Sequence, residues 1–211
     1  MANANRQFQV ADAATLQALV RAQPLSTLVI AHEGALHVNH IPLYLDPERG
    51  PHGTLIGHVA RANGVWPLLP QQAVAVFHGP QAYISPSWYP SKALDGKQVP
   101  TWNYAAVHAH GTLCAVDDPE RLRAILHTLS ERHEAHRAEP WRLDDAPPDY
   151  IDKMLRAIVG IELPVDRWEG IWKVSQNRTD TDRAGVVQGL LAECTAAAED
   201  MAALVLGGLM A

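Results

Sequence analysis

Polar and apolar residues alternate along several short stretches of the chain, a period of two that is typical of half-buried β-strands. Glycine and proline bound most of these stretches, as expected where strands end in turns. Glu33 and Gly34 predict the turn of a hairpin between the first two. The stretches predicted as six to eight strands cover residues 25–31, 36–45, 54–59, 73–77, 82–85, 99–110 with its continuation 111–116, 158–165 and 170–174.

A second pattern, with apolar residues three and four positions apart, predicts helices with one buried face. The clearest begins at Asp118 as the N-cap, with Pro119 as the first helical residue. Other helices are expected after the cap residue Asp12, at residues 63–69 and 150–157, from Thr181 or Asp182 to Leu191, and along the alanine-rich stretch 192–206.

Strands do not alternate regularly with long helices, which argues against a doubly wound parallel sheet. The pattern favours an α+β fold in which an antiparallel barrel carries peripheral helices, because closing a barrel removes exposed strand edges. The length of 211 residues suits one domain with a helical appendage. We expect the domain to cover residues 1–191, with a C-terminal helix or tail at 192–211.

Composition narrows the class of protein further. The formal net charge is −6, which opposes nonspecific attraction to nucleic-acid phosphates. Residues 1–9 lack the apolar core of a signal peptide, and no apolar stretch approaches the ~20 residues that span a bilayer. Cys114 and Cys194 lie far apart without a CxxC spacing, so we expect two buried free thiols in a reducing compartment. The chain is expected to be cytoplasmic and free of membranes.

Two segments in the first third of the chain are candidates for ligand binding. His40 stands in an apolar strand two residues before Pro42, and its ordinary interpretation is a histidine bonded to a nearby carbonyl. His58, Arg61 and Asn63 lie where a strand gives way to the expected helix. Backbone N–H groups at a helix N-terminus and an arginine suit a phosphate, although a surface arginine beside an asparagine cap fits equally.

Two further segments combine aromatic and polar side chains. Thr101, Trp102, Asn103 and Tyr104 follow one another on a strand. A flavin ring needs a flat apolar wall and hydrogen-bonding groups for its edge, and this run supplies both. Because successive side chains alternate between faces, only Thr101 with Asn103, or Trp102 with Tyr104, can face one site. A dimer interface or an aromatic lid is the alternative interpretation.

Lys173 and Arg178 close the last expected strand and could neutralise a phosphate, or stand as solvated charges at a strand end. His133 and His136 flank Glu134 without forming an HExxH motif, so no metal site is predicted. The sequence contains no GxSxG, GxGxxG or P-loop motif, and no convincing helix-turn-helix. No catalytic residue is assigned.

Taken together, these segments resemble the PaiB-like, FMN-binding negative transcriptional regulators. The resemblance covers about residues 5–190, and Gly64 departs from it, because the family usually has proline there. The stretches that carry it are His40-Ile41-Pro42-Leu43, GHVARAN at 57–63, FHGPQAYISPSWYPSK at 77–92, VPTWNYAAVHAHG at 99–111, Arg132-His133-Glu134, MLRAIVGI at 154–161, 172–178, and Asp182-Arg183.

The resemblance implies an FMN-binding split barrel that works as a homodimer, with FMN at the subunit interface. It further implies that Arg61 and its loop meet the phosphate, that the strand around His40 lines the flavin edge, and that residues 101–104 come from the same or the partner subunit. It also implies negative regulation of protease production and sporulation. The acidic charge argues against direct DNA binding. A flavin-dependent oxidoreductase acting on a small molecule, and a cofactor-free dimeric interaction module, remain the alternatives.

Overall fold

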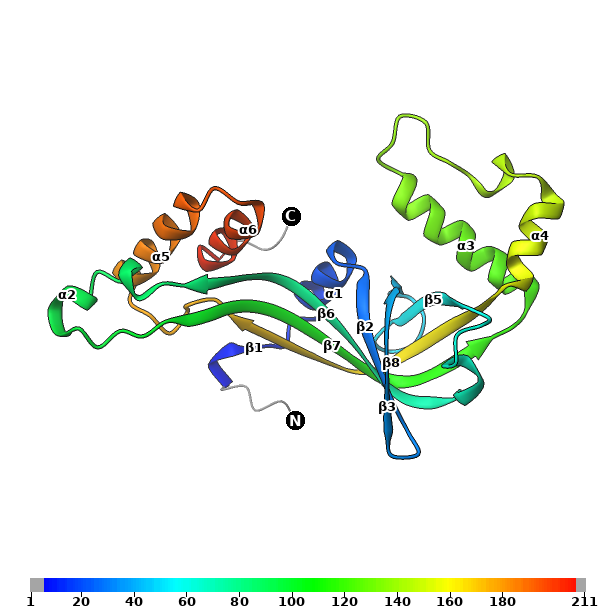
Figure 1. The fold of residues 1–211 in the computed structure, drawn as a ribbon, viewed down its shortest axis with the longest axis horizontal. Coiled ribbons are helices and arrows are strands. Elements are labelled where there is room, and N and C mark those ends of the chain that lie inside the picture. The colour runs from blue at the N-terminus through cyan, green and yellow to red at the C-terminus, as the bar shows by residue number, and fades with distance from the viewer. Residues whose placement is uncertain (1–5, 208–211) are drawn as a thin grey trace. The chain divides into compact units, whose positions relative to one another are not determined.

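The computed structural model describes residues 6–207, and the chain forms two compact units (Figure 1). The first unit comprises Met1–Gln23, Phe77–His108 and Trp168–Ala211, and the second comprises Pro24–Val76 and Ala109–Arg167. Three long strands, β6, β7 and β8, contribute residues to both units. Among the described residues, no helix is both long and apolar enough to cross a membrane.

Helices and strands follow one another without a regular βα alternation. The strands are β1 (Gln9–Val10), β2 (Leu25–His32), β3 (Ala35–Pro42), β4 (Tyr44–Asp46), β5 (Thr54–Ala60), β6 (Gln71–Ile84), β7 (Thr101–Val116) and β8 (Ile158–Lys173). The α-helices are α1 (Ala13–Ala22), α2 (Lys92–Asp95), α3 (Pro119–Glu134), α4 (Pro148–Arg156), α5 (Asp180–Ala192) and α6 (Ala196–Val205). Short 3-10 helices cover η1 (Arg6–Phe8), η2 (Trp66–Leu68), η3 (Pro86–Trp88) and η4 (Leu143–Asp145).

The strands form one sheet in the order β3-β2-β6-β7-β8-β5-β4, and β1 pairs with β8. The β2–β3, β2–β6, β4–β5, β5–β8 and β1–β8 pairs are antiparallel. Glu33 and Gly34 make the β2–β3 turn with φ angles of 48° and 80°, as their sequence predicts. Pro42 ends β3, the first strand in the order, where a missing N–H costs no ladder bond. These findings confirm an α+β fold built on an antiparallel sheet.

In the second unit, helix α3 covers strand β5. Asp118 caps α3 by accepting a hydrogen bond from Arg121 N at 2.7 Å, as the Asp-Pro signal predicts. Buried residues join the helix to the sheet in one cluster and to α4 in another. The first cluster contains Tyr44, Ile56, Ile125 and Leu129, and the second contains Leu122, Leu143, Ile151 and Leu155.

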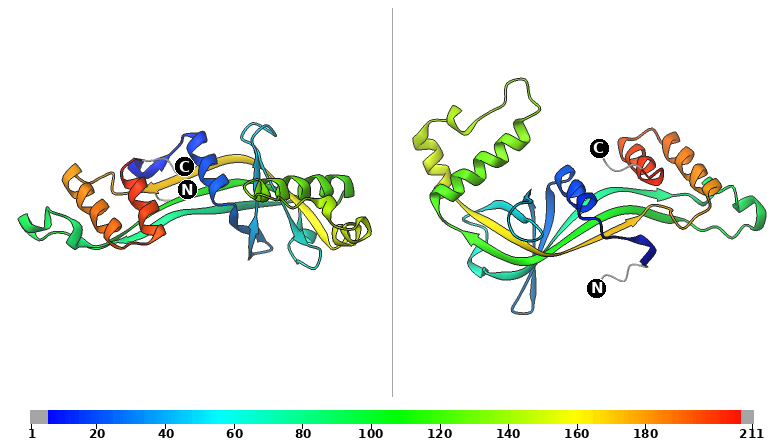
Figure 2. Two further views of the ribbon diagram at one scale, coloured as in Figure 1. Left: turned by 90° about the horizontal axis from the view of Figure 1, so that it is seen from above. Right: turned by 180° about the vertical axis from the view of Figure 1, so that it is seen from behind.

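In the first unit, α5 and α6 lie against each other at the C-terminal end of the chain (Figure 2). Thr179 caps α5 by accepting a hydrogen bond from Asp182 N, so the helix begins two residues earlier than expected. Gly185 and Gly189 stand one turn apart on α5, and any side chain at either position would collide with Trp88. The two glycines therefore form a notch that holds Trp88.

Several sequence expectations require correction. No α-helix forms at 63–69, where the only helical turn is η2, because Pro67 and Pro70 deprive the segment of hydrogen-bond donors. Residues 158–165 and 170–173 belong to one strand, β8, rather than two, and 73–77 and 82–84 likewise belong to β6. Both cysteines are free, but neither is buried as expected, because Cys114 is partly exposed and Cys194 is exposed.

Candidate functional site

Four of the expected ligand-binding residues belong to the second unit, where Asn63 joins the loop after β5 to strand β3. Asn63 donates from Nδ2 to Oδ1 of Asn39 at 2.9 Å, and its own Oδ1 accepts from Val65 N at 2.9 Å. His40 lies beside Thr27, with 3.3 Å between Nδ1 and Oγ1. Asn63 is thus held by the protein itself, while His40 remains exposed on the sheet.

Arg61 is fully engaged by groups of its own unit. Its guanidinium pairs in bidentate fashion with Asp117, donates from Nε to Arg156 O at 2.9 Å and from Nη2 to Ile158 O at 3.0 Å, and lies 5.5 Å from the Trp66 ring centroid. The hydrogen bonds to Asp117 raise the pKa of Arg61 and lower that of the carboxyl. A phosphate at Arg61 would have to displace Asp117, and the helix expected at 63–69 does not form there.

His58 faces the helical side of β5. Its partner in the β5–β8 ladder is Gly160, and a Cβ at Gly160 would lie 3.1 Å from both Leu122 and Ile125 of α3. Directly paired residues share a face, so His58 lies under α3. Its Nδ1 is buried without a hydrogen-bond partner, and burial lowers the pKa of the imidazole.

The other expected residues gather in the first unit, where β7 meets the end of β8. Lys173 donates from Nζ to Thr101 Oγ1 at 2.5 Å, and Asn103 donates from Nδ2 to Ser175 Oγ at 2.9 Å. Asn103 is only 1% exposed, and its Oδ1 has no hydrogen-bond partner. Of the two alternating pairs on β7, Thr101 and Asn103 are therefore the pair that lies on the same face as Lys173.

Trp102 projects from the opposite face of β7. Its ring lies edge-on to Tyr83 with 6.2 Å between centroids, and its Nε1 donates to Gln81 Oε1 at 3.2 Å. Trp102 and Tyr83 are each 49% exposed, which is high for aromatic side chains of this size. This face of the first unit therefore offers a partly open aromatic surface.

Arg178 extends the polar group around Lys173. Its guanidinium lies 4.7 Å from the Tyr89 ring centroid and donates from Nη1 to Gln98 Oε1 at 3.0 Å. Tyr89 is 2% exposed and its hydroxyl lacks a hydrogen-bond partner. Burial raises the pKa of Tyr89, and the neighbouring Arg178 opposes that shift.

The cations of the two units differ in how they are neutralised. Arg61 pairs with Asp117, whereas neither Lys173 nor Arg178 forms an ion pair with a carboxylate among residues 6–207. An uncompensated, half-buried cation attracts an anionic ligand more strongly than a paired one does. Lys173 and Arg178 are therefore better suited to bind a phosphate than Arg61, which is already paired with Asp117.

Sequence reasoning missed four members of the first-unit group: Tyr89, Ser91, Gln98 and Ser175. Each lies in or beside a stretch that the family resemblance had already marked, but none belongs to a recognised chemical motif. Ser175 has a positive φ of 62°, an uncommon conformation for a residue other than glycine. The positive φ would have marked Ser175 as a candidate site residue, but residue type alone does not predict it.

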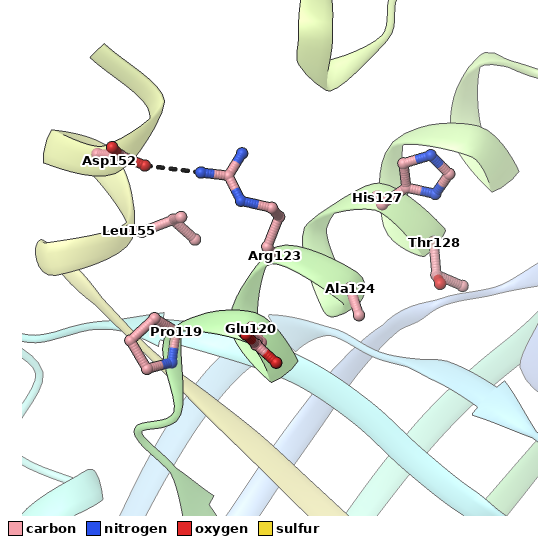
Figure 3. A pocket seen from close by; sticks show the side chains of 8 residues that line it. All are labelled: Pro119, Glu120, Arg123, Ala124, His127, Thr128, Asp152 and Leu155. Atoms are coloured by element: carbon pink, nitrogen blue, oxygen red, sulfur yellow. Dashed lines mark hydrogen bonds and ion pairs between the residues drawn. The ribbon is translucent and has the colours of Figure 1, made fainter. Parts of the chain in front are cut away.

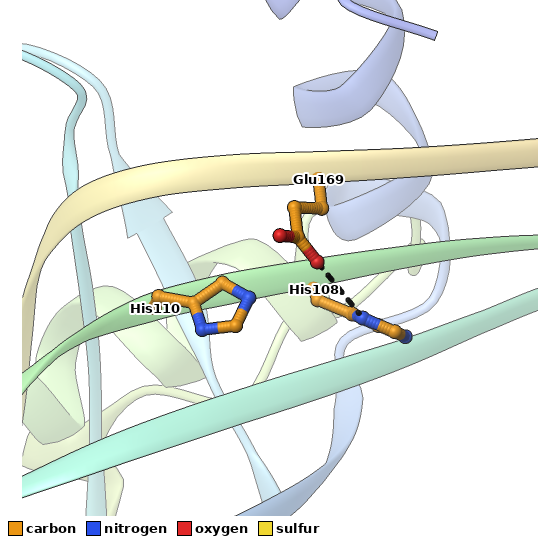
Figure 4. A group of neighbouring side chains, drawn as sticks. All are labelled: His108, His110 and Glu169. Atoms are coloured by element: carbon orange, nitrogen blue, oxygen red, sulfur yellow. Dashed lines mark ion pairs between the residues drawn. The ribbon is translucent and has the colours of Figure 1, made fainter. Parts of the chain in front are cut away.

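Other polar features of the two units lie outside the first-unit group around Lys173 and Arg178. In the first unit, His108 Nδ1 on β7 lies 3.7 Å from Glu169 Oε2 on β8 (Figure 4). In the second, a pocket of about 500 Å³ lies along α3 and α4, where Arg123 pairs with Asp152 at 2.6 Å (Figure 3). An adjoining pocket of about 400 Å³ includes Arg61 and Asp117.

Comparison with known proteins places this geometry in a family. Residues 3–167 match the family described as "Putative FMN-binding domain". The chain is 32% identical over 200 residues to "Protease synthase and sporulation protein PAI 2" of Bacillus subtilis, covering 94% of this chain and 93% of that protein. An uncharacterized protein of Emericella nidulans is 33% identical over 218 residues, covering 85% and 86% of the two chains.

Solved structures show the same fold at low identity. The FAD and heme binding protein from Mycobacterium smegmatis has a TM-score of 0.59 and 16% identity, over 78% of this chain and 72% of that one. The flavocytochrome Anf3 from Azotobacter vinelandii has a TM-score of 0.59 and 14% identity, over 81% and 72%. The architecture is thus that of the flavin-binding split barrels. The chain belongs to the PaiB-like family of FMN-binding domains, and the expectation of FMN as cofactor is confirmed at the level of the family.

Proposed function

We propose that this chain is an FMN-binding homodimer with a regulatory, redox-sensing output. The observation that carries the proposal is the similarity to PAI 2 of Bacillus subtilis along nearly the whole of both chains, because the name of that relative connects it with protease synthesis and sporulation. The net charge of −6 makes direct binding to DNA the less favoured route to regulation.

The residues of the first unit suit FMN. Lys173, Arg178 and Thr101 would hold the phosphate, since both cations lack an acidic partner among the described residues. Asn103 Oδ1 is a buried acceptor in need of a donor, whereas Trp102 lies on the opposite face of β7 and stays outside this group. Bound FMN would supply one- and two-electron redox chemistry, and the protein would supply binding, orientation and electrostatics. His40, His58 and Asn63 belong to the second unit and remain predictions from the family resemblance.

The exposed apolar face of the β2–β3 hairpin supports a homodimer. Leu25, Leu36 and Val38 are 61%, 71% and 56% exposed, and the ladder pairs Val38 with Val29. Adjacent exposed apolar residues on one sheet face mark interaction sites more often than scattered ones do. A second copy would cover them, and light scattering of the purified protein would then give twice the mass of 23.0 kDa.

Two measurements separate regulation from the alternatives. Steady-state turnover of NAD(P)H by the FMN-loaded protein, far above that of free FMN, would favour the oxidoreductase. Changed transcription in a deletion strain, restored by the wild-type chain but not by a variant that no longer binds FMN, would support the regulatory proposal. Restoration by the FMN-free variant would instead support a cofactor-free interaction module.

The choice of phosphate-binding cation can be tested with two flavins. We expect Arg178→Gln to weaken FMN binding about 10- to 100-fold, because a hydrogen bond to a charged group contributes about 1.5–3 kcal/mol. Riboflavin lacks the phosphate, so its affinity should change by less than about twofold. Fluorescence titration of both flavins measures the difference.

Arg61→Gln is the matched comparison. It removes a guanidinium of the same kind from the second unit, where Asp117 already neutralises it. We expect it to lower the melting temperature and to change the FMN and riboflavin affinities equally. An FMN-specific loss from Arg61→Gln, with none from Arg178→Gln, would assign the phosphate to Arg61.

A further inference from the structure

Asp182 is a buried carboxylate that forms no ion pair with a cation among residues 6–207. It is the third residue of α5 and is 3% exposed. Its two oxygens accept hydrogen bonds from Ser91 N at 3.0 Å and Ser91 Oγ at 2.8 Å. Burial alone would raise the pKa of Asp182, but hydrogen bonds with Ser91 and Thr179 and the charge of Arg178 together keep the pKa below its usual value. The carboxylate therefore stays charged at neutral pH.

A chain of hydrogen bonds runs from this carboxylate to Arg178. Ser91 gives its hydroxyl hydrogen to Asp182, which leaves its oxygen free to accept from Gln98 Nε2 at 2.9 Å. Gln98 then presents Oε1 to Arg178 Nη1 at 3.0 Å. Every link has one possible direction, because the carboxylate can only accept and the guanidinium can only donate.

We propose that Asp182 is a positioning residue that orients the guanidinium of Arg178, through Ser91 and Gln98, toward the phosphate of a bound flavin. This inference rests on the proposed function, since it concerns the same site. The inference adds Asp182 to the site, although Asp182 has no direct contact with Arg178. It also gives a reason for burying the charge of this carboxylate.

The relay orients Arg178 without an ion pair, although the charge of Arg178 is near enough to help lower the pKa of Asp182. A carboxylate paired directly with Arg178 would compete with the phosphate, as Asp117 does at Arg61. Gln98 is neutral and fixes only the direction of the guanidinium, whose opposite face lies over the Tyr89 ring. Because an arginine side chain loses considerable rotamer freedom on binding, holding it in place beforehand strengthens binding.

A purely structural role for Asp182 predicts something different. The two hydrogen bonds from Ser91 also fasten the segment between η3 and β7 to α5. If fastening were the whole purpose, loss of the carboxylate would lower stability and affect every flavin alike. The phosphate-specific part of the affinity therefore distinguishes orientation of Arg178 from simple fastening.

The test compares FMN with riboflavin in titrations of the full chain. We expect Asp182→Asn to raise the Kd for FMN about tenfold and to change the Kd for riboflavin by less than about twofold. Asp180→Asn is the matched control, because the Asp180 side chain is fully exposed two residues earlier and should leave both affinities unchanged. Equal losses for both flavins, or no loss for either, would overturn the inference.

Ser91→Ala covers the case in which Asp182→Asn fails to fold. It removes the hydroxyl link but keeps the Ser91 backbone bond to the carboxylate. We expect it to weaken FMN binding about five-fold with riboflavin unaffected, and an FMN affinity equal to wild type would overturn the relay. If the wild-type chain binds riboflavin and FMN with equal affinity, the proposed role of Asp182 is wrong, but flavin binding itself stands. If it binds neither flavin, the proposed function fails as well.

Discussion

Replacing Glu162 with alanine is expected to lower the free energy of unfolding by about 3 kcal/mol. The carboxylate accepts two hydrogen bonds from Arg49, both at 2.8 Å, and two from Arg121, at 2.9 and 2.8 Å. Its side chain is 13% exposed, while the arginines are 40% and 35% exposed. Because water reaches the arginines, the loss should lie at the lower end of the range for a broken buried pair. Urea unfolding measures it.

The same carboxylate should make the protein sensitive to acid. Hydrogen bonds from Arg49 and then Arg121 hold the pKa of Glu162 below its ordinary value, although burial opposes this. A folded-state pKa below the unfolded value of about 4.3 gives stability that is present above that pH and is lost as the pH falls through the folded pKa. Glu162→Gln should therefore lose less stability between pH 6 and 3 than wild type does. An identical acid loss in the two proteins would contradict the role of Glu162.

Substituting Gly185 with alanine should destabilise the first unit by about 1–2 kcal/mol. The new Cβ would lie 2.1 Å from the carbonyl oxygen of Trp88 and 2.9 Å from Pro90 Cδ, so the backbone of one element must move. Overpacking of this kind costs about 1–3 kcal/mol or more, which exceeds the gain of about 1 kcal/mol from placing alanine in a helix. Thermal unfolding and tryptophan fluorescence both report the change.

Gly64→Ala is the control for this prediction. Nothing lies within 4 Å of the position its Cβ would take, and its backbone does not require a positive φ. Its stability should stay within about 0.5 kcal/mol of wild type. If Gly185→Ala is as stable as Gly64→Ala, Trp88 does not pack in the notch on α5.

Elements with a strong local signal could be predicted from sequence. The Asp118-Pro119 cap and the spacing of Leu122, Ile125 and Leu129 define α3, because capping and amphipathicity act over a few residues. The prediction of a helix at 63–69 was wrong. The spacing of Trp66 and Leu69 suggested one buried helical face, but Pro67 and Pro70 prevent continuous helical hydrogen bonding. Proline chemistry outweighed periodicity there.

The candidate site was predictable only in part. Residue type and alternation identified Thr101 and Asn103 as possible ligands, but the choice between them and Trp102 needed the pairing with Lys173 and Ser175. The Asp182–Ser91 contact joins residues 91 positions apart, and no local pattern specifies such a partner.

Arg61 shows the opposite failure. An arginine after a strand suggested a phosphate ligand, yet the bidentate partner Asp117 lies 56 positions away and could not be seen in the sequence. Residue type therefore indicated the chemistry that a side chain can perform, and only the fold showed whether that capacity is already satisfied.

The visible absorption spectrum of the freshly purified protein tests the central claim, FMN binding by this chain, most directly. We expect flavin bands near about 450 nm, or their appearance with a raised melting temperature when FMN is added to colourless protein. FMN binding by this chain would be contradicted by colourless protein whose melting temperature is unchanged by added FMN and which leaves the fluorescence of that FMN unchanged.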